Sequence, residues 1–335
     1  MKTPLVSIVI PFKNTGSFLE ACLNSIIAQT FINWEVLAVN DASSDRSLAI
    51  VQNYASKDRR IKVFHNNGQG IIEALRTAYT FSEGKFITRM DSDDLMMPER
   101  LKIMVTDLEN KGKGHVAVGQ VKYFSKKGIS NGYQRYEKWL NALTLKGTNY
   151  SELYKECVIP SPCWMVHKSD LELCGAFEPN EYPEDYDLAF RFYEHGLKII
   201  PSEHVLLKWR DYDHRTSRTS AHYAHNYFLD IKLRYFIKLH LNRDGNLVVW
   251  GAGNKGKRIA TILIDRKIPF HWICNNPKKI GREIYGKILL PINSLENIPN
   301  TQSIITVANE EEQQHIHNYF DKCGKISMKD YFFFC

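Results

Sequence analysis

The stretch Lys85–Asp94, which reads KFITRMDSDD, decides how this chain folds and where its chemistry lies. Its first part, Lys85–Met90, predicts a β-strand that runs directly into Asp91-Ser92-Asp93-Asp94. Three carboxylates within four residues repel one another unless a cation lies among them. Mg²⁺ and Mn²⁺ prefer hard oxygen ligands and bind well through one or two carboxylates together with substrate phosphates. A solvated acidic turn is the alternative, but ligands of open α/β sheets bind outside the carboxyl ends of strands, which favours a functional site.

Upstream of this stretch, strand and helix signals alternate. Strands are predicted at Val6–Pro11, Trp34–Asn40 and Ile61–His65, and apolar residues at helical spacing fill the intervals. This alternation predicts a doubly wound, mostly parallel sheet of the α/β class. Asp41 and Asp45 would then lie at the same edge of the sheet as the acidic turn. A helix cap explains Asp45 equally well, whereas Asp41 is harder to explain in that way.

The middle of the chain is less regular. A strand is predicted at His115–Phe124, whereas residues 125–155 are polar and aromatic and carry no firm prediction. Glu184-Asp185 opens an amphipathic helix that ends at Gly196. Acidic residues at a helix start commonly act as caps. The same position can also present a carboxylate rigidly to an acceptor hydroxyl, so both residues are candidates for a general base.

Composition limits the classes of protein to consider. The 335 residues predict two or three domains, and a net charge of +7 without a dense basic stripe argues against a nucleic-acid partner. Seven cysteines without a C-x-x-C pair predict a reducing compartment. We see no signal peptide and no run of about eighteen apolar residues that could span a membrane. We therefore expect a cytoplasmic protein, and peripheral contact with the inner face of the membrane stays open.

The C-terminal region reads as a separate unit behind a helical linker at 221–245. The helix in this linker is expected to pack as a connector, with a membrane-surface helix as the alternative. Gly251, Gly253 and Gly256 form a G-x-G-x-x-G turn between a strand and a helix, which can place phosphates on the helix N-terminus. The next strand ends in Cys274-Asn275-Asn276-Pro277 without an acid for a ribose, which puts a complete NAD site in doubt. A degenerate or structural role is slightly favoured over a second nucleotide site.

An ordered series of motifs resembles the family 2 glycosyltransferases of the GT-A fold. The series is SIVIP at Ser7–Pro11, VNDASSD at Val39–Asp45, GxG at 68–70 with Ala74, GKFI at Gly84–Ile87, MDSDD at Met90–Asp94, PERL at Pro98–Leu101 and EDYDL at Glu184–Leu188. The resemblance implies a GT-A domain at 1–220, with a nucleotide-binding half at about 1–104 and an acceptor half at about 105–220. The segment Asn276–Gly281 resembles Rossmann-like nucleotide-sugar domains, which implies a small Rossmann-like α/β domain at 246–335.

The resemblance to this family also implies roles for the donor side. Pro11 and Phe12 would line the base pocket, and Asp41 would read the nucleobase. Asp91 would contact the ribose or the metal. Asp93 would coordinate the Mn²⁺ or Mg²⁺ that bridges the diphosphate, and Asp94 would assist it.

Further roles follow for the diphosphate and the acceptor. Arg210 and His214 would bind the nucleotide, together with Arg215 and Arg218 of the same basic segment, for which a solvated loop is the alternative. Asp185 would be the general base, and Glu184 is the second choice. The implied reaction is inverting transfer of a hexose from a nucleotide-diphosphate sugar, with a UDP-sugar favoured, to a hydroxyl of a glycan or lipid-linked acceptor. Bacterial surface polysaccharide synthesis is the implied setting.

Three other functions remain to be weighed. An NAD-linked oxidoreductase built on the C-terminal glycine turn would leave the acidic turn unexplained. A non-catalytic nucleotide-sugar-binding protein would need no base at Asp185. A metal-independent scaffold would use the linker helix to bind a partner.

Overall fold

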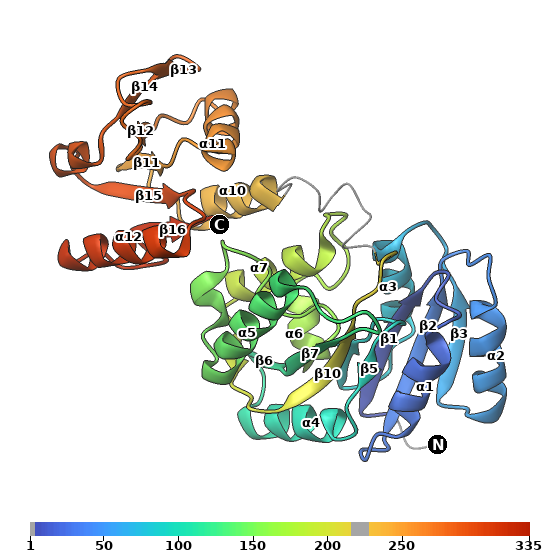
Figure 1. Cartoon of the computed structure of the whole chain (residues 1–335). Coiled ribbons are helices and arrows are strands. Elements are labelled where there is room, and N and C mark those ends of the chain that lie inside the picture. The colour runs from blue at the N-terminus through green and yellow to red at the C-terminus, as the bar shows by residue number, and fades with distance from the viewer. Residues whose placement is uncertain (1–3, 216–227) are drawn as a thin grey trace. The chain divides into compact units, whose positions relative to one another are not determined.

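The computed structural model describes residues 4–215 and 228–335, and the chain divides into two compact units. The first unit comprises residues up to 150 and 157–215, and the second comprises Ser151–Glu156 and the residues from 216 onward. Each unit contains its own sheet (Figure 1).

The first unit is built on a seven-stranded sheet with the order β3-β2-β1-β4-β8-β6-β9. Its strands are β1 (Val6–Phe12), β2 (Trp34–Asn40), β3 (Ile61–His65), β4 (Phe86–Arg89), β6 (His115–Val118), β8 (Trp164–His167) and β9 (Lys198–Ile200). All neighbouring strands are parallel except β8, which is antiparallel to β4 and β6. Every residue of β1 and β2 is buried, as their apolar runs predict.

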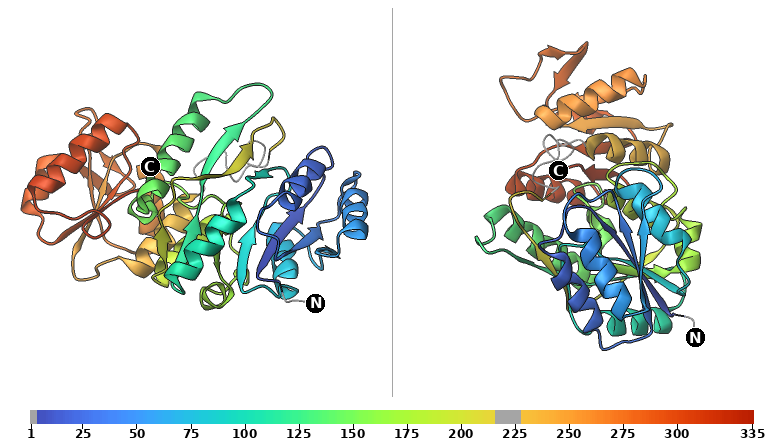
Figure 2. Two further views of the ribbon diagram at one scale, coloured as in Figure 1. Left: turned by 90° about the horizontal axis from the view of Figure 1, so that it is seen from below. Right: turned by 90° about the vertical axis from the view of Figure 1, so that its right-hand side faces the viewer.

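The helices of the first unit can be followed by colour in Figure 2. They are α1 (Leu19–Ile27), α2 (Ser47–Lys57), α3 (Ile71–Thr80), α4 (Arg100–Lys111), α5 (Asn131–Lys146), α6 (Lys168–Leu173) and α7 (Glu184–Glu194). A short 3₁₀ helix, η1 (Asn149–Glu152), follows α5 in the chain. Helix α3 packs on β1 and β2, and α4 packs on β6 and β8. Because β1, β2 and β4 run parallel, the turns that follow them meet at one edge of the sheet.

A second, three-stranded sheet with the order β5-β10-β7 lies in the same unit. Its strands are β5 (Leu95–Met96), β7 (Gln120–Phe124) and β10 (Val205–Arg210). The single strand expected at His115–Phe124 is therefore wrong, because the chain changes sheets at Gly119. A Cβ on Gly119 would lie 2.6 Å from the Cβ of Leu206, so only glycine fits this crossing.

Helix α5 occupies the region for which the sequence carried no firm prediction. Ser130 caps the helix by accepting a hydrogen bond from the backbone N–H of Tyr133, and the helix ends at Gly147 with φ +67°. Its buried residues include Leu140 and Thr144.

The second unit contains a six-stranded sheet with the order β13-β14-β12-β11-β15-β16. Its elements are α10 (Phe228–Leu239), β11 (Asn246–Trp250), α11 (Asn254–Asp265), β12 (His271–Ile273), β13 (Glu283–Ile284), β14 (Lys287–Leu290), η2 (Ile292–Asn297), β15 (Thr301–Ile305), α12 (Glu310–Lys322) and β16 (Tyr331–Phe333). The pairs are parallel except for the β13–β14 hairpin.

The unit boundaries differ from the expected domains in two places. The described part of the expected linker helix, α10, is an integral part of the second unit, with Leu233 and Phe236 fully buried. The segment Ser151–Glu156, expected in the first domain, also belongs to the second unit. Its Tyr154 stacks on Phe334 with ring centroids 5.1 Å apart. Among the helices that the structure describes, none combines the length and the apolar character needed to cross a bilayer.

Candidate functional site

The acidic turn after β4 is held by three different partners. Asp91 Oδ1 accepts a 2.8 Å hydrogen bond from Arg89 Nε, and Asp93 Oδ2 accepts one of 2.9 Å from the hydroxyl of Tyr212. Asp94 Oδ1 accepts a 2.7 Å bond from the backbone N–H of Arg210. The turn is thus fixed both to its own strand and to the end of β10.

Burial and repulsion from neighbouring carboxylates make Asp93 and Asp94 costly to ionise. Burial and the charge of Asp91 raise the pKa of Asp93, and burial and the charge of Asp93 raise the pKa of Asp94 well above its usual range. Asp94 Oδ2 is buried and has no hydrogen-bond partner among the residues that the structure describes. A divalent cation would relieve this repulsion, so the donor set fits the expected metal.

The expected metal ligands differ in how accessible they are. Asp94 is 1% exposed, whereas Asp91 and Asp93 are partly exposed, so Asp91 and Asp93 are the better candidates. Within residues 4–215 and 228–335, no three His, Cys, Asp or Glu side chains form a group that could hold a metal ion. An ion bound here would therefore depend on diphosphate oxygens to complete its coordination, as is usual for Mg²⁺.

The start of helix α7 is tied to the acidic turn by one arginine. Arg89 Nη1 lies 2.8 Å from Glu184 Oε1, while the same guanidinium binds Asp91 through Nε. Neighbouring Asp185 is half-buried, and its Oδ1 accepts a 2.8 Å bond from the backbone N–H of Tyr186. Burial and the charge of Glu184 raise the pKa of Asp185 to about 7, against the opposing charge of Arg89. The structure thus brings Asp91, Glu184 and Asp185 into one site.

Arg89 was missed by the sequence reasoning. It is the fourth residue of a buried strand, where a charged side chain needs a partner. That signal could have singled it out, but the sequence does not say which partner it has.

Asp41 lies at the same sheet edge and organises the loop before α3. Its Oδ1 accepts bonds from Asn66 Nδ2 (2.7 Å) and from the backbone N–H of Gly70 (3.0 Å), and its Oδ2 lies 3.1 Å from Lys13 Nζ. Burial acts to raise the pKa of Asp41, but these hydrogen bonds outweigh it and lower the pKa. Asn66 and Lys13 were missed from the sequence, although an Asn-Asn-Gly turn directly after a strand is a usable signal.

The two residues expected in the base pocket are buried at the end of β1. Phe12 is 2% exposed and belongs to the apolar core of the first unit, and Pro11 is also buried. The ring of Phe12 therefore packs into the core, while its backbone carbonyl accepts a 2.9 Å bond from Asp41 N–H. The backbone of Phe12 is thus connected to Asp41, whereas Pro11 pairs with Val39 of β2.

The basic segment is only partly within the described residues. Arg210 Nε donates to the carbonyl of Asp93 at 2.6 Å, and its guanidinium lies over the rings of Phe18 and Phe124. His214 is exposed in the turn that follows Tyr212. Arg210 is thus brought to the acidic turn, whereas no contact with that turn is shown for His214 within the described part of the chain. Arg218, with the rest of 216–220, lies outside it.

Arg215 was a secondary candidate, and it faces the aromatic side of β10. Its guanidinium lies 4.9 Å from the ring of Trp209 and 5.9 Å from that of Tyr123. Burial alone would lower the pKa of Arg215, but the charges of Asp94 and Asp93, together with Tyr123, raise it. Arg215 therefore stays positively charged close to the acidic turn.

The glycine turn of the second unit has a clear structural reason for two of its three glycines. Gly251 has φ +117°, and a Cβ on Gly256 would lie 2.0 Å from the carbonyl oxygen of Gly251. A Cβ on Gly253 would meet nothing within 4 Å, so the N-terminus of α11 is open there. Lys279 Nζ donates to the carbonyl of Ala252 at 2.8 Å. Gly251 and Gly256 therefore allow the close approach of α11 to β11.

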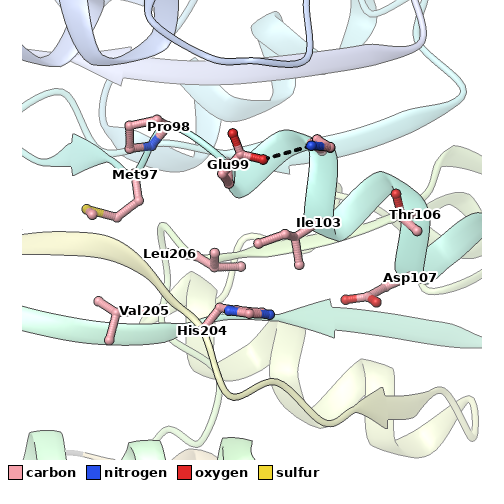
Figure 3. A pocket seen from close by; sticks show the side chains of 10 residues that line it. Met97, Pro98, Glu99, Ile103, Thr106, Asp107, His204, Val205 and Leu206 are labelled. Atoms are coloured by element: carbon pink, nitrogen blue, oxygen red, sulfur yellow. Dashed lines mark hydrogen bonds and ion pairs between the residues drawn. The ribbon is translucent and has the colours of Figure 1, made fainter.

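A cavity of about 660 Å³ lies elsewhere in the first unit (Figure 3). It is lined by residues 97–99 before α4, by one side of the first half of α4, and by residues 204–206 around the start of β10. Figure 3 shows Ile103 and Leu206 on its walls and Asp107 and His204 at one end. None of the expected site residues lines this cavity.

Comparisons with known proteins bear on the fold and the family. The model of glycosyl transferase family 2 matches residues 7–174. Over 208 residues the chain is 30% identical to the putative glycosyltransferase EpsH of Bacillus subtilis, which covers 57% of this chain and 56% of EpsH. The chain thus spans little more than half the length of this relative.

Two solved structures resemble the chain in fold. Residues 1–349 of S. aureus TarS, in complex with UDP-GlcNAc, superpose with a TM-score of 0.52 at 18% identity, covering 77% of this chain and 71% of that one. The mannosyltransferase PcManGT from Pyrobaculum calidifontis, in complex with GDP-Man and Mn²⁺, gives a TM-score of 0.52 at 18% identity, covering 71% and 64%. The family match and these superpositions confirm the predicted GT-A fold class.

Proposed function

The chain belongs to glycosyl transferase family 2, and on this premise we propose that it is an inverting transferase that uses a nucleotide-diphosphate sugar. A UDP-sugar is the proposed donor, and the proposed acceptor is a hydroxyl of a glycan or lipid-linked glycan. One observation carries the proposal: Arg89 joins Asp91 of the acidic turn to Glu184, whose neighbour Asp185 has a pKa of about 7. This contact supports a single site that contains both the turn proposed to bind the diphosphate and the candidate base.

The donor side of the site is proposed to lie along the edge formed by β1, β2 and β4. Asp41 and its partners Asn66 and Gly70 form a polar loop suited to a nucleobase. Asp93 and Asp91 would hold Mn²⁺ or Mg²⁺, which when bound would neutralise charge on the departing diphosphate. Arg210 lies against the carbonyl of Asp93 and would add positive charge on the same side.

Asp185 is proposed as the general base. Its carboxylate would take the proton from the acceptor hydroxyl as that oxygen bonds to the anomeric carbon. The bond from the anomeric carbon to the diphosphate oxygen breaks in the same step, with its electron pair leaving on the diphosphate. This single displacement inverts the anomeric centre. Glu184 is less suited because Oε1 is engaged by Arg89.

A raised pKa suits this role because a base near neutrality combines availability with proton affinity. Burial and Glu184 raise the pKa of Asp185 to about 7. A non-catalytic binding protein would have no need of such a group. Surface polysaccharide synthesis is the proposed setting, and it is supported by 30% identity over 106 residues to the hyaluronan synthase of Pasteurella multocida.

The test begins with thermal stabilisation by UDP, GDP, CMP and NAD, each with and without Mn²⁺. We expect a Mn²⁺-dependent shift with a nucleoside diphosphate, and a shift with NAD alone would contradict the proposal. Release of nucleoside diphosphate from the matching nucleotide sugars is then measured for the wild type and Asp185→Asn. The substitution should lower turnover roughly 10²–10⁴-fold, while nucleotide affinity stays within a few-fold. Asp230→Asn, at an exposed carboxylate of the second unit, is the control and should turn over normally.

A further inference from the structure

Arg89 is the side chain that physically connects the two halves of the proposed site. Its side chain is 6% exposed, and its partners Asp91 and Glu184 are 22% and 12% exposed. Nε contacts Asp91 Oδ1 and Nη1 contacts Glu184 Oε1, each at 2.8 Å. A guanidinium holds such geometry well because it is planar and offers its donors as a fixed fork.

The backbone of Arg89 is itself held by a hydrogen bond from a buried side chain, Arg100. Arg100 is fully buried, and its Nη2 donates to the carbonyl oxygen of Arg89 at 3.1 Å and to Thr88 Oγ1 at 2.9 Å. The carbonyl of Arg89 at the end of β4 is thus held by a fully buried side chain. Because the Arg89 backbone is held in this way, its side chain can fix the position of Glu184 at the start of α7.

We infer that Arg89 is a positioning residue, which orients Glu184 and thereby Asp185 toward the acceptor side while holding Asp91 on the donor side. This inference deepens the proposed function and rests on it. Arg89 need not touch the substrate for this role, because it acts through the first turn of α7. Removing it would leave the partly buried carboxylate of Glu184 without this cation.

The charges around Asp185 give this arrangement an electrostatic signature. Glu184 on the same helix raises the pKa of Asp185, Arg89 on β4 lowers it, and Asp91 beyond Arg89 raises it. For Arg89 itself, burial would lower the pKa, but the charges of Asp91, Glu184 and Asp185 outweigh it, so the guanidinium stays charged. Arg89 and Glu184 therefore act on Asp185 in opposite directions.

The helix offers a matched control for loss of a buried ion pair. Arg191 Nε lies 2.7 Å from Asp187 Oδ2, with exposed fractions of 10% and 3%. Arg191 also donates to the carbonyl of Ala176 at 2.9 Å. This pair lies on α7 like Glu184, but among the described residues the polar partners of Arg191 are Asp187 and the carbonyls of Cys174 and Ala176, not the acidic turn. Arg191→Met should lower the melting temperature without changing kinetics per folded molecule.

The experiment compares Arg89→Met, Arg89→Lys, Glu184→Gln and Arg191→Met in the full chain. The readout is release of nucleoside diphosphate from the nucleotide sugar that the wild type hydrolyses, measured from pH 5 to 9. Arg89→Met should lower kcat roughly tenfold to a hundredfold through misplacement of the base, and move the acid limb of the profile to higher pH. Glu184→Gln should move that limb to lower pH. Arg89→Lys keeps the positive charge but not the planar set of donors. Its acid limb should therefore lie close to that of the wild type, whereas its kcat should stay below the wild-type value.

A second readout does not depend on turnover. The pKa of the Asp185 carboxyl is followed by ¹³C NMR in protein labelled at aspartate, with Asp185→Asn used for assignment. It should rise in Arg89→Met, fall in Glu184→Gln and stay unchanged in Arg191→Met. The inference is overturned if Arg89→Met and Arg191→Met behave alike in both readouts. It is also overturned if the pKa of Asp185 shifts in the same direction in Arg89→Met and in Glu184→Gln. Absence of hydrolysis with every nucleotide sugar would count against the proposed function, and the NMR titration would still decide the role of Arg89.

Discussion

The hydroxyl of Tyr212 donates a 2.9 Å hydrogen bond to Asp93 Oδ2, so the end of β10 supplies a neutral donor to the acidic turn. Burial and the nearby charge of Asp91 still raise the pKa of Asp93. The turn therefore carries a carboxylate that destabilises the folded chain when it is ionised.

Asp93→Asn should stabilise the protein in the absence of divalent ions. A carboxyl with a raised pKa in the folded state binds protons more tightly there than in the unfolded chain, where its pKa is about 3.9. The ionised Asp93 therefore does not reduce the free energy of unfolding at low pH. The reduction grows as the pH rises through the pKa of Asp93 in the folded protein. We expect the melting temperature of Asp93→Asn to exceed that of the wild type at pH 8, and this advantage to shrink toward pH 4. Equal melting temperatures at pH 8 would contradict this account.

The same substitution should remove metal-dependent nucleotide binding. Asparagine keeps a single neutral oxygen and is a poorer ligand for Mn²⁺ than a carboxylate. The Mn²⁺-dependent part of the nucleotide-induced thermal shift should disappear, and Tyr212→Phe, which only removes the hydroxyl donor, should retain it. Retention of the full shift in Asp93→Asn would place the metal elsewhere.

Turnover of the wild type should rise with pH through the pKa of Asp185. Burial and Glu184 raise this pKa to about 7, and a general base acts only when it is deprotonated. The profile of kcat against pH should therefore show an acid limb near neutrality. A profile that is already flat between pH 5 and 6 would exclude Asp185 as a base with this pKa.

Asp41→Ala should lower both stability and nucleotide binding. It removes the acceptor for Asn66, Gly70 N–H and Lys13, at a cost of about 1–3 kcal/mol for the donors left unpaired. Because the folded pKa of Asp41 is lowered, its contribution is present above about pH 4 and is lost as pH falls. Urea denaturation at pH 7 and pH 3.5 should show the difference from wild type narrowing at the lower pH. Asn66→Ala, which removes one of the three donors, should cost less.

The glycine turn of the second unit allows a paired test. Gly256→Ala places a methyl group 2.0 Å from the carbonyl of Gly251, so α11 must move and stability should fall by about 1–3 kcal/mol or more. Gly253→Ala meets nothing within 4 Å and should cost at most about 1 kcal/mol. Denaturant unfolding checks both, and similar costs for the two variants would contradict the geometry.

The N-terminal sheet was predictable because its strands are short runs rich in β-branched and aromatic residues that alternate with helical patterns. Trp34–Asn40 and Ile61–His65 match β2 and β3 residue for residue. The exchange of sheets at Gly119 could not be predicted, because it depends on the close approach of Leu206, which is distant in sequence. Helix α5 was missed because it is polar on much of its surface and packs mainly through residues such as Leu140.

The site, too, has a part that could be predicted from the sequence and a part that could not. The placement of Asp41 and Asp91 at one edge of the sheet was predicted from parallel strands, and β1, β2 and β4 do run parallel. The bridge from Asp91 through Arg89 to Glu184 joins residues ninety-five positions apart, so spacing alone could not reveal it. The same is true of Tyr212 and Asp93. Their roles in binding and catalysis stay predictions.

The assignment of Ser151–Glu156 to the second unit means that the chain cannot be divided into modules by a single cut. Tyr154 is 1% exposed and is surrounded by Phe236, Phe332 and Phe334. An expression product that stops at residue 215 would leave this tyrosine without those rings, and a transplanted C-terminal unit would lack it. Exchange of C-terminal units between related transferases, in the laboratory or by recombination, would have to carry this hexapeptide along to keep both cores intact.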